Sequence, residues 1–313
     1  MQRPRLTTAL FHPRYWLTWL SIGMWWLISQ LPYRIQLILA RPFGWLMLLF
    51  GRRRRHIALR NLELCFPDRS DAEHRRLLRE NFYSTAMAFF ETGIAWFWSR
   101  RRLRRLFTIE GLEHLEASKG QGVLLMAMHF TTLDIGASFM SICCSIDGMY
   151  RPHRNLVYDF IQHRGRGRHN PESDPMPRDD IRAMMRALKK GRVVWYAPDQ
   201  DYGRKRSVFV PFFGIEAASV TATAKFSLLG NARVIPFTHT RLAGGKGYKV
   251  TVYPPLENFP CGDDRADARR INAFVEARIL EHPQQYMWVH RRFKSRPPGA
   301  EDLYGLPPKH RTR

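Results

Sequence analysis

The stretch GVLLMAMHFTTLD, residues 122–134, indicates the fold class and contains the first candidate site. Residues 122–128 are a short apolar run bounded by glycine and histidine, which is typical of a buried β-strand. Residues 133–143 can form a helix directly after it. At such a junction the imidazole of His129 can point out of the sheet into a cleft. Asp134, on the first helical turn, can fold back toward that ring.

A histidine paired with a carboxylate is suited to proton transfer. The carboxylate fixes the imidazole tautomer and stabilises the imidazolium, so the other ring nitrogen can take a proton from a hydroxyl. Such general-base assistance is worth on the order of a hundred- to ten-thousandfold in rate. No serine or cysteine nucleophile with its own base is evident, so direct attack by an acceptor oxygen is expected. Because His-x4-Asp also occurs by chance, His129 acting only as a helix cap, with Asp134 in the first turn, remains the alternative.

Outward from this stretch, strand and helix patterns alternate from about residue 107 onward. This alternation predicts an α/β domain over residues 106–295, with a central mixed sheet flanked by helices on both faces. The expected helices cover 156–162, 178–190, 220–229 and 264–280, and the expected strands cover 193–197, 233–240 and 249–253.

Helical patterns precede this domain and a basic tail follows it. Residues 51–105 are predicted to be helical and to pack on the core, because 71–88 carries apolar positions at helical spacing after an early aspartate. Residues 296–313 are rich in proline and basic side chains and are expected to be a solvated extension.

The N-terminal residues 1–50 are the candidate membrane segment. The run from Tyr15 to Leu31 has no charged residue and contains four tryptophans, at the short end of what spans a bilayer. A second apolar stretch, 43–50, is followed by the arginines of 52–55, and cationic clusters stay cytoplasmic. We therefore expect a single anchor helix and an interfacial helix, with the catalytic body on the cytoplasmic face. A buried helix of a soluble domain is the alternative, and no A-x-A-type site supports a cleaved signal peptide.

The composition indicates an anionic partner. The 313 residues carry a formal charge of +23, with a pI near 10.6, which favours nucleic acid, a phospholipid surface or a phosphorylated substrate. Nine tryptophans and 13% aromatic residues favour the membrane, where aromatic belts form, over nucleic acid. The four cysteines lack metal-ligand spacing and are expected to be reduced thiols. No Gly-rich nucleotide loop or zinc signature is present, so neither a cofactor nor a metal is expected.

Two polar blocks follow the candidate pair. Residues 164–168, RGRGR, are interpreted as a compact cationic loop in which Arg164 and Arg166 bind phosphate. The loop has no interleaved aromatics for stacking on nucleic-acid bases, and a merely solvated loop is the alternative. The second block, APDQDYGRKR at 197–206, follows a predicted strand. Clusters at strand ends predict one cleft beside the sheet.

The motifs HFTTLDIG, YRPHR, RGRGR, APDQDYGRKR, VPFFG and QQYMWVHRRFKSRP, in this order, resemble the bacterial late acyltransferases of lipid A biosynthesis. YWLTWL, NLELCFP and ETGIAWFW resemble the lauroyl branch of that family. The resemblance implies an inner-membrane enzyme working on the cytoplasmic face. It would transfer a fatty acyl chain, lauroyl for this branch, from acyl carrier protein. The acceptor would be a hydroxyl on a primary acyl chain of a Kdo-bearing lipid A precursor.

The resemblance also implies roles by position. His129 would be the general base and Asp134 its orienting acid, although many relatives have glutamate there. Arg164 and Arg166 would hold acceptor phosphates or carboxylates, or stabilise the oxyanion, and Asp199 would organise these arginines.

The remaining assignments are less specific. Gln200, Asp201 and Arg204 are further substrate-binding candidates. Residues 288–293 are either a core strand with a basic end or part of the site. The acyl chain is expected to lie in an apolar slot formed by residues 80–98 and 209–213.

Two other functions remain open. One is an acyltransferase of the same superfamily that acts on glycerol phosphate or a mannosylated phosphatidylinositol, with the same chemistry and a different acceptor pocket. The other is a basic membrane- or nucleic-acid-binding module, which predicts that His129→Ala has no effect and that salt controls binding.

Overall fold

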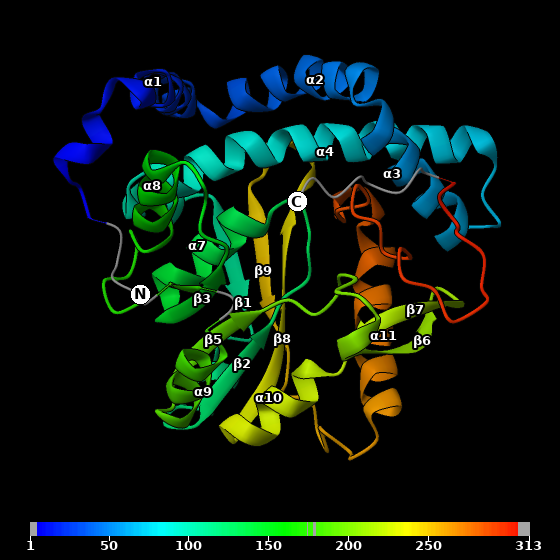
Figure 1. Cartoon of the computed structure of the whole chain (residues 1–313). Coiled ribbons are helices and arrows are strands. Elements are labelled where there is room, and N and C mark those ends of the chain that lie inside the picture. The colour runs from blue at the N-terminus through cyan, green and yellow to red at the C-terminus, as the bar shows by residue number, and fades with distance from the viewer. Residues whose placement is uncertain (1–4, 174, 178–179, 306–313) are drawn as a thin grey trace.

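The computed structural model describes residues 5–173, 175–177 and 180–305. The start of the helix predicted over 178–190 and the end of the tail predicted over 296–313 lie outside these residues. The chain forms a central sheet with helices on both faces, and two N-terminal helices lie along the outer side (Figure 1).

The central sheet has the strand order β1-β9-β8-β2-β5-β3-β4. Strand β2 runs parallel to both of its neighbours, β5 and β8, whereas β8 and β9 are antiparallel, so the predicted mixed sheet is confirmed. The strands are β1 Phe107–Glu110, β2 Gly122–Met126, β3 Ile146–Tyr150, β4 Met176–Pro177, β5 Val193–Tyr196, β8 Ala232–Arg241 and β9 Tyr248–Val252.

Strand β2 lies in the interior of the sheet and is buried along its whole length. A central parallel strand is covered on both faces, which explains its continuous apolar sequence. Residues 123, 125 and 127 belong to the core cluster that includes side chains of α7 (Leu133–Cys143), and residues 124, 126 and 128 belong to the cluster that includes side chains of α11 (Asp264–Glu281). The period of two along the strand therefore divides the core into two layers.

The helices predicted from periodicity are confirmed in the described residues. Helix α4 begins at a capping box in which Ser70 and Glu73 bond to each other's backbone N–H groups. The longer helices are α1 Trp16–Gln30, α2 Tyr33–Phe50, α3 Arg52–Cys65, α4 Asp71–Phe97, α8 Leu156–Arg166, α9 Ile181–Lys189 and α10 Ala222–Gly230, with short α5 Arg100–Leu103 and α6 Glu113–Glu116.

The N-terminal helices pack on the rest of the molecule. Helices α1 and α2 lie on the outer side of α4 (Figure 1), and Tyr33 at the start of α2 contacts Tyr248 of β9, with ring centroids 5.8 Å apart. Gly44 makes this possible, because a Cβ there would lie 2.9 Å from the Cα of Tyr83 on α4. Within the described part of the chain, no helix combines the length and apolarity needed to cross a membrane.

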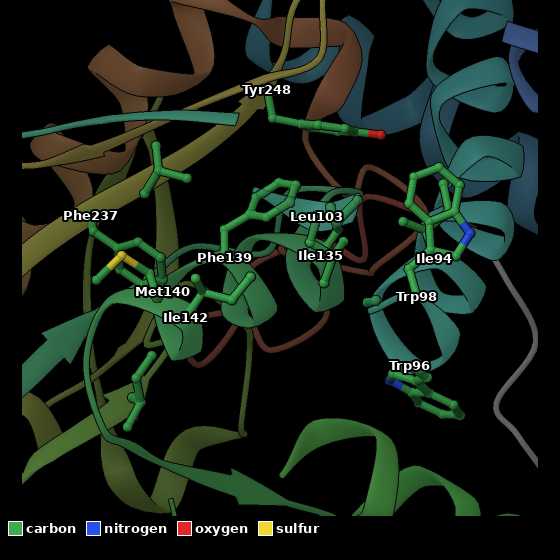
Figure 2. Packing of buried hydrophobic residues seen from close by; sticks show 14 of the residues in the cluster. Ile94, Trp96, Trp98, Leu103, Ile135, Phe139, Met140, Ile142, Phe237 and Tyr248 are labelled. Carbon is green, nitrogen blue, oxygen red and sulfur yellow. The ribbon is translucent and has the colours of Figure 1, made fainter. Parts of the chain in front are cut away.

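Helix α7 is held in place by one of the two main core clusters. Its Phe139 stacks on Phe107 of β1 with ring centroids 4.4 Å apart and contacts Tyr248 of β9 at 5.2 Å. Figure 2 shows Phe139 and Tyr248 together with Ile94 and Trp96 of α4 and Trp98, which follows that helix. This packing fixes the start of α7, where the candidate site lies.

Other segments were not predicted correctly. Residues 207–220 form a hairpin of β6 (Ser207–Phe212) and β7 (Ile215–Val220), and the proline within β6 obscures its strand character. Its two-residue turn, Phe213 and Gly214, has positive φ at both positions. Residues 288–293 form no strand; Trp288 and Phe293 are buried in irregular backbone.

Candidate active site

His129 is held by Asp199. The ring Nδ1 lies 2.6 Å from Asp199 Oδ1, and the backbone N–H of His129 donates to Asp199 Oδ2 at 2.8 Å. The parallel register pairs Met126 of β2 with Tyr196 of β5. His129 and Asp199 each follow their paired residue by three positions, so the two parallel strands deliver both side chains to the same edge of the sheet.

The hydrogen bonds define the protonation of the pair. A carboxylate accepts, so Nδ1 carries the proton and Nε2 is left as the basic nitrogen, an assignment that follows from the bonding pattern. Burial would raise the pKa of Asp199, but the electrostatic interaction with the His129 ring and the hydrogen bonds from its ring and backbone outweigh burial and lower that pKa. Asp199 is therefore an anion at neutral pH and stabilises an imidazolium.

Asp134 has a different partner. Its Oδ1 accepts a hydrogen bond from Nε of Arg166 at 3.0 Å and forms an ion pair with Nη2 of the same guanidinium, also at 3.0 Å. The prediction that Asp134 holds the imidazole is therefore wrong for this structure, and the orienting carboxylate is Asp199. The physical reason is that Asp199 comes from the neighbouring strand and takes Nδ1, while Asp134 faces the last turn of α8. The prediction that Asp199 organises Arg164 and Arg166 is corrected by the same contacts.

The segment between β2 and α7 is tied to the C-terminal part of the chain. The N–H of Met287 donates to the carbonyl oxygen of His129 at 2.9 Å, and the N–H of Thr131 donates to the carbonyl oxygen of Gln285 at 2.7 Å. The hydroxyls of Thr131 and Ser84, on α4, are 2.7 Å apart. These contacts give residues 285–287 a positioning role that the sequence motif alone did not reveal.

Two buried histidines near the pair are neutral. The hydroxyl of Thr132 bonds to the carbonyl oxygen of His239 at 2.6 Å and contacts its Nδ1 at 2.8 Å, and burial lowers the pKa of His239 to about 4. Burial also lowers the pKa of His290 to about 4, with His129 acting in the same direction. Nε2 of His290 accepts from the backbone N–H of Asp201 at 3.3 Å. His239 was not predicted as part of the site, whereas His290 falls in the segment 288–293, for which a role in the site was one of the two interpretations.

Two cavities meet at His129. The apolar cavity, of about 330 Å³, lies between α7, β3 and β5. The basic cavity, of about 630 Å³, is bordered by Arg204, Lys205 and Arg206. They share the lining residues His129, Met149, Tyr150, Arg151 and Trp195. The basic nitrogen of the pair is thus placed between a site suited to hydrocarbon and a site suited to an anion.

Two of the three arginines predicted as a cationic loop, Arg164 and Arg166, lie on a helix, and Arg168 lies in the turn that follows it. Residues 164–166 form the last turn of α8, and Gly165 faces Trp96 of α4, where a Cβ would come within 2.5 Å of the indole. The glycine therefore permits close helix packing, not close approach of a phosphate. Arg166 lines the apolar cavity beside Asp134. Arg164 is exposed and lines neither of the two cavities.

The residues of the 197–206 block are divided among different roles. Asp201 is buried and accepts from the N–H and hydroxyl of Ser295 at 2.6 and 2.9 Å and from the N–H of Gly203 at 2.8 Å. Its carboxylate therefore holds the C-terminal segment, and the prediction that it binds substrate is corrected. Gln200 is half-buried and lines neither of the two cavities. Arg204 is exposed at the border of the basic cavity, where its role in binding remains a prediction.

The apolar cavity is not formed by the segments from which the acyl slot was predicted. None of the residues lining the apolar cavity falls in 80–98 or 209–213. Those segments supply buried side chains such as Phe82, Phe90 and Phe212 to the core. Among the described residues, no cluster of His, Cys, Asp and Glu is arranged to hold a metal ion.

The fold and the site together define a transferase class. A histidine base on an α/β sheet, between an apolar and a cationic cavity, is suited to moving an acyl group onto a hydroxyl of a charged acceptor. Residues 3–295 match the family described as bacterial lipid A biosynthesis acyltransferase. The chain belongs to this family.

Individual relatives agree with this assignment. The lipid A biosynthesis lauroyltransferase of Escherichia coli K12 is 45% identical over 96% of this chain and 99% of its own length. The palmitoleoyltransferase of the same organism is 42% identical over 96% of this chain and 98% of its own length. The solved structure of a 1-acyl-sn-glycerophosphate acyltransferase from Thermotoga maritima aligns with 79% of this chain and over 97% of the Thermotoga chain. The TM-score of this alignment is 0.36 and the sequence identity is 14%. That structural likeness is too distant to carry an inference.

Proposed function

We propose that this O-acyltransferase adds a secondary acyl chain to a lipid A precursor, by transfer of a lauroyl group from acyl carrier protein to a hydroxyl on a primary acyl chain. Family membership supports the reaction class and the lipid A acceptor. The observation that carries the mechanism is the His129–Asp199 pair at the junction of the two cavities.

In this mechanism Nε2 of His129 removes the proton from the acceptor hydroxyl. The oxygen attacks the thioester carbonyl, forming the new C–O bond and a tetrahedral oxyanion. The C–S bond then breaks, and the imidazolium returns its proton to the leaving sulfur. Asp199 stabilises the imidazolium, as the buried carboxylate does in hydrolase triads. Charge is balanced at each step, and no acyl-enzyme intermediate forms.

Arg166 is the proposed oxyanion donor. Its guanidinium lines the apolar cavity together with His129 and is held there by Asp134. A fixed donor aimed at developing negative charge stabilises the transition state more than the ground state. Asp134 is then a positioning residue that acts through Arg166.

The basic cavity is the proposed site for the anionic part of the acceptor. Arg151, Arg204, Lys205 and Arg206 line it and suit phosphate and carboxylate groups. The overall charge of +23 would also steer an acidic carrier protein toward the enzyme.

Helices α1 and α2 are the proposed membrane-binding surface, on the cytoplasmic face of the inner membrane. Trp16, Trp45 and Phe50 are 64%, 60% and 76% exposed. Further exposed apolar side chains on these helices are Leu17, Leu20, Met24, Trp26, Leu27, Ile35, Ile38, Leu39, Leu46 and Leu49. An apolar, Trp-rich surface of this kind is suited to the headgroup region of a bilayer, from which a lipid acceptor can be drawn.

The test uses the full chain with phospholipid vesicles, lauroyl-acyl carrier protein and a Kdo-bearing lipid A precursor, with product analysis by mass spectrometry. We expect one added lauroyl group on a primary chain hydroxyl, and no product with His129→Ala. Transfer to glycerol phosphate or to a phosphatidylinositol mannoside, with the lipid A precursor unchanged, would overturn the proposed acceptor. Retention of activity by His129→Ala would overturn the proposed base.

A further inference from the structure

The walls of the apolar cavity follow the periodicity of two elements. Leu133, Ala137 and Ser141 are spaced four residues apart, so they share one face of α7. On the opposite wall, Ile146 and Gly148 alternate with Asp147 along β3, so they share one face of the strand. One face of α7 and the start of β3 therefore form two of the walls of the cavity, and further residues such as Pro175 and Trp195 complete the lining.

The cavity has a mouth and a far end. Leu133 lies beside His129, and Ser141 lies eight residues further along α7, or roughly 12 Å at the rise of an α-helix. Ile146 is the first residue of β3, whereas Tyr150 ends the strand near His129 and borders both cavities. Ser141 and Ile146 are buried, at 6% and 5% exposed, and their positions on α7 and β3 place them at the end of the cavity remote from the base.

The charged groups are confined to the mouth. Arg151 borders the junction with the basic cavity, and Asp134 and Arg166 pair with each other beside the start of α7. Away from the mouth the cavity is lined by small or apolar groups, among them Ala137, Ser141, Ile146 and Gly148. If a hydrocarbon chain enters past His129 with its methyl end first, charged side chains lie only near its reacting carbonyl.

Gly148 controls how much of this space is open. A Cβ placed on Gly148 meets no atom within 4 Å, unlike the tightly enclosed Gly136 and Gly165. The backbone of Gly148 is not in the left-handed region, so a larger residue is conformationally acceptable there. Since Ile146, on the same strand face, also lines the cavity, a side chain at position 148 would occupy the cavity without displacing the protein.

We propose that Gly148, together with Ser141 and Ile146, sets the length of the acyl chain that the enzyme transfers. The inference rests on the acyl transfer proposed above. Gly148 leaves the passage open, and Ser141 and Ile146 form the floor that the methyl end of the chain reaches. One methylene in an apolar pocket is worth roughly tenfold or more in kcat/KM, so a floor at fixed depth is enough to select a length.

The experiment is a competition among acyl carrier protein thioesters with saturated chains shorter than, equal to and longer than lauroyl, with products resolved by mass. Gly148→Leu and Ser141→Leu should shift the products to shorter chains by roughly tenfold or more in relative kcat/KM. Ile146→Ala, which lowers the floor, should shift them to longer chains. General destabilisation would reduce transfer of all lengths and could not produce opposite shifts.

Two further variants make the outcome decisive. Gly148→Ala adds only the methyl group for which the structure leaves room and replaces Gly148→Leu if the larger variant does not fold. Cys143→Leu, which adds bulk on α7 at a residue that does not line this cavity, should leave the length distribution unchanged. Folded, active variants with wild-type distributions would overturn the inference. Failure of the wild-type chain to transfer any length would instead overturn the proposed function.

Discussion

Asp199 accepts two hydrogen bonds from His129, one from the ring Nδ1 at 2.6 Å and one from the backbone N–H at 2.8 Å. A single buried carboxylate thus fixes both the position of the residue and the orientation of its ring. The pairing crosses between neighbouring parallel strands, β2 and β5. The two aspartates of the site therefore have different partners: Asp199 holds His129, and Asp134 holds Arg166.

Asp199→Asn should lower kcat on the order of a thousandfold or more, with little change in KM, because the amide neither fixes the Nδ1–H tautomer nor stabilises the imidazolium. Steady-state kinetics measure the loss, and nitrogen NMR of the His129 ring reports the tautomer. Asp134→Asn should leave the ring in the Nδ1–H form. A changed tautomer in Asp134→Asn, with none in Asp199→Asn, would contradict the assignment.

Arg166→Ala and Arg164→Ala form a matched pair on the last turn of α8. Removing Arg166 should reduce kcat on the order of a hundredfold, the usual effect of losing an oxyanion donor. Removing the exposed Arg164 should change kcat only slightly, because it lines neither of the two cavities. Single-turnover measurements of acyl transfer test the pair, and equal losses for both variants would argue against the role given to Arg166.

The free energy of unfolding should fall as the pH is lowered from about 6.5 toward 4, because His239 and His290 have folded-state pKa values of about 4. Both histidines are neutral when buried, and the unfolded chain, with its ordinary histidine pKa, binds more protons in this window. Their stabilising contribution is therefore complete above the unfolded pKa and is lost on acidification. Urea unfolding at several pH values measures the slope.

His290→Gln tests the contribution of one of these two groups. Glutamine does not titrate and can still accept a hydrogen bond from the N–H of Asp201. The variant should therefore show a shallower decline of the free energy of unfolding between pH 6.5 and 4. An unchanged slope would mean that His290 is not a buried neutral group.

Trp45→Ser combined with Phe50→Ser should weaken binding to anionic phospholipid vesicles several-fold, because both side chains lie exposed on α2. Leu228→Ser and Leu229→Ser on α10 remove exposed apolar surface elsewhere and serve as the control. Vesicle co-sedimentation measures both. An equal loss of vesicle binding in the α2 variant and the α10 control would show that α2 has no special part in membrane binding.

Local patterns predicted most of the regular structure. The apolar run of β2 and the periodicity of α4 and α7 are properties of neighbouring residues, so their positions could be predicted before the structure was known. The β6–β7 hairpin was missed because its strand character depends on pairing and is interrupted by Pro211. The RGRGR segment was misread because glycine suggests a loop, whereas Gly165 is required by the close packing of α8 on Trp96.

The amino-acid sequence by itself determined the α/β class, the family and the choice of His129 as the candidate base, because these depend on local periodicity and on an ordered set of motifs. Only the tertiary structure decided which carboxylate holds His129. That choice depends on β5 pairing with β2, although α7 and β3 come between them in the chain, and on the register that places Met126 opposite Tyr196. Backbone hydrogen bonds make this pairing, and they leave no signature in the side chains from which strand order could be read.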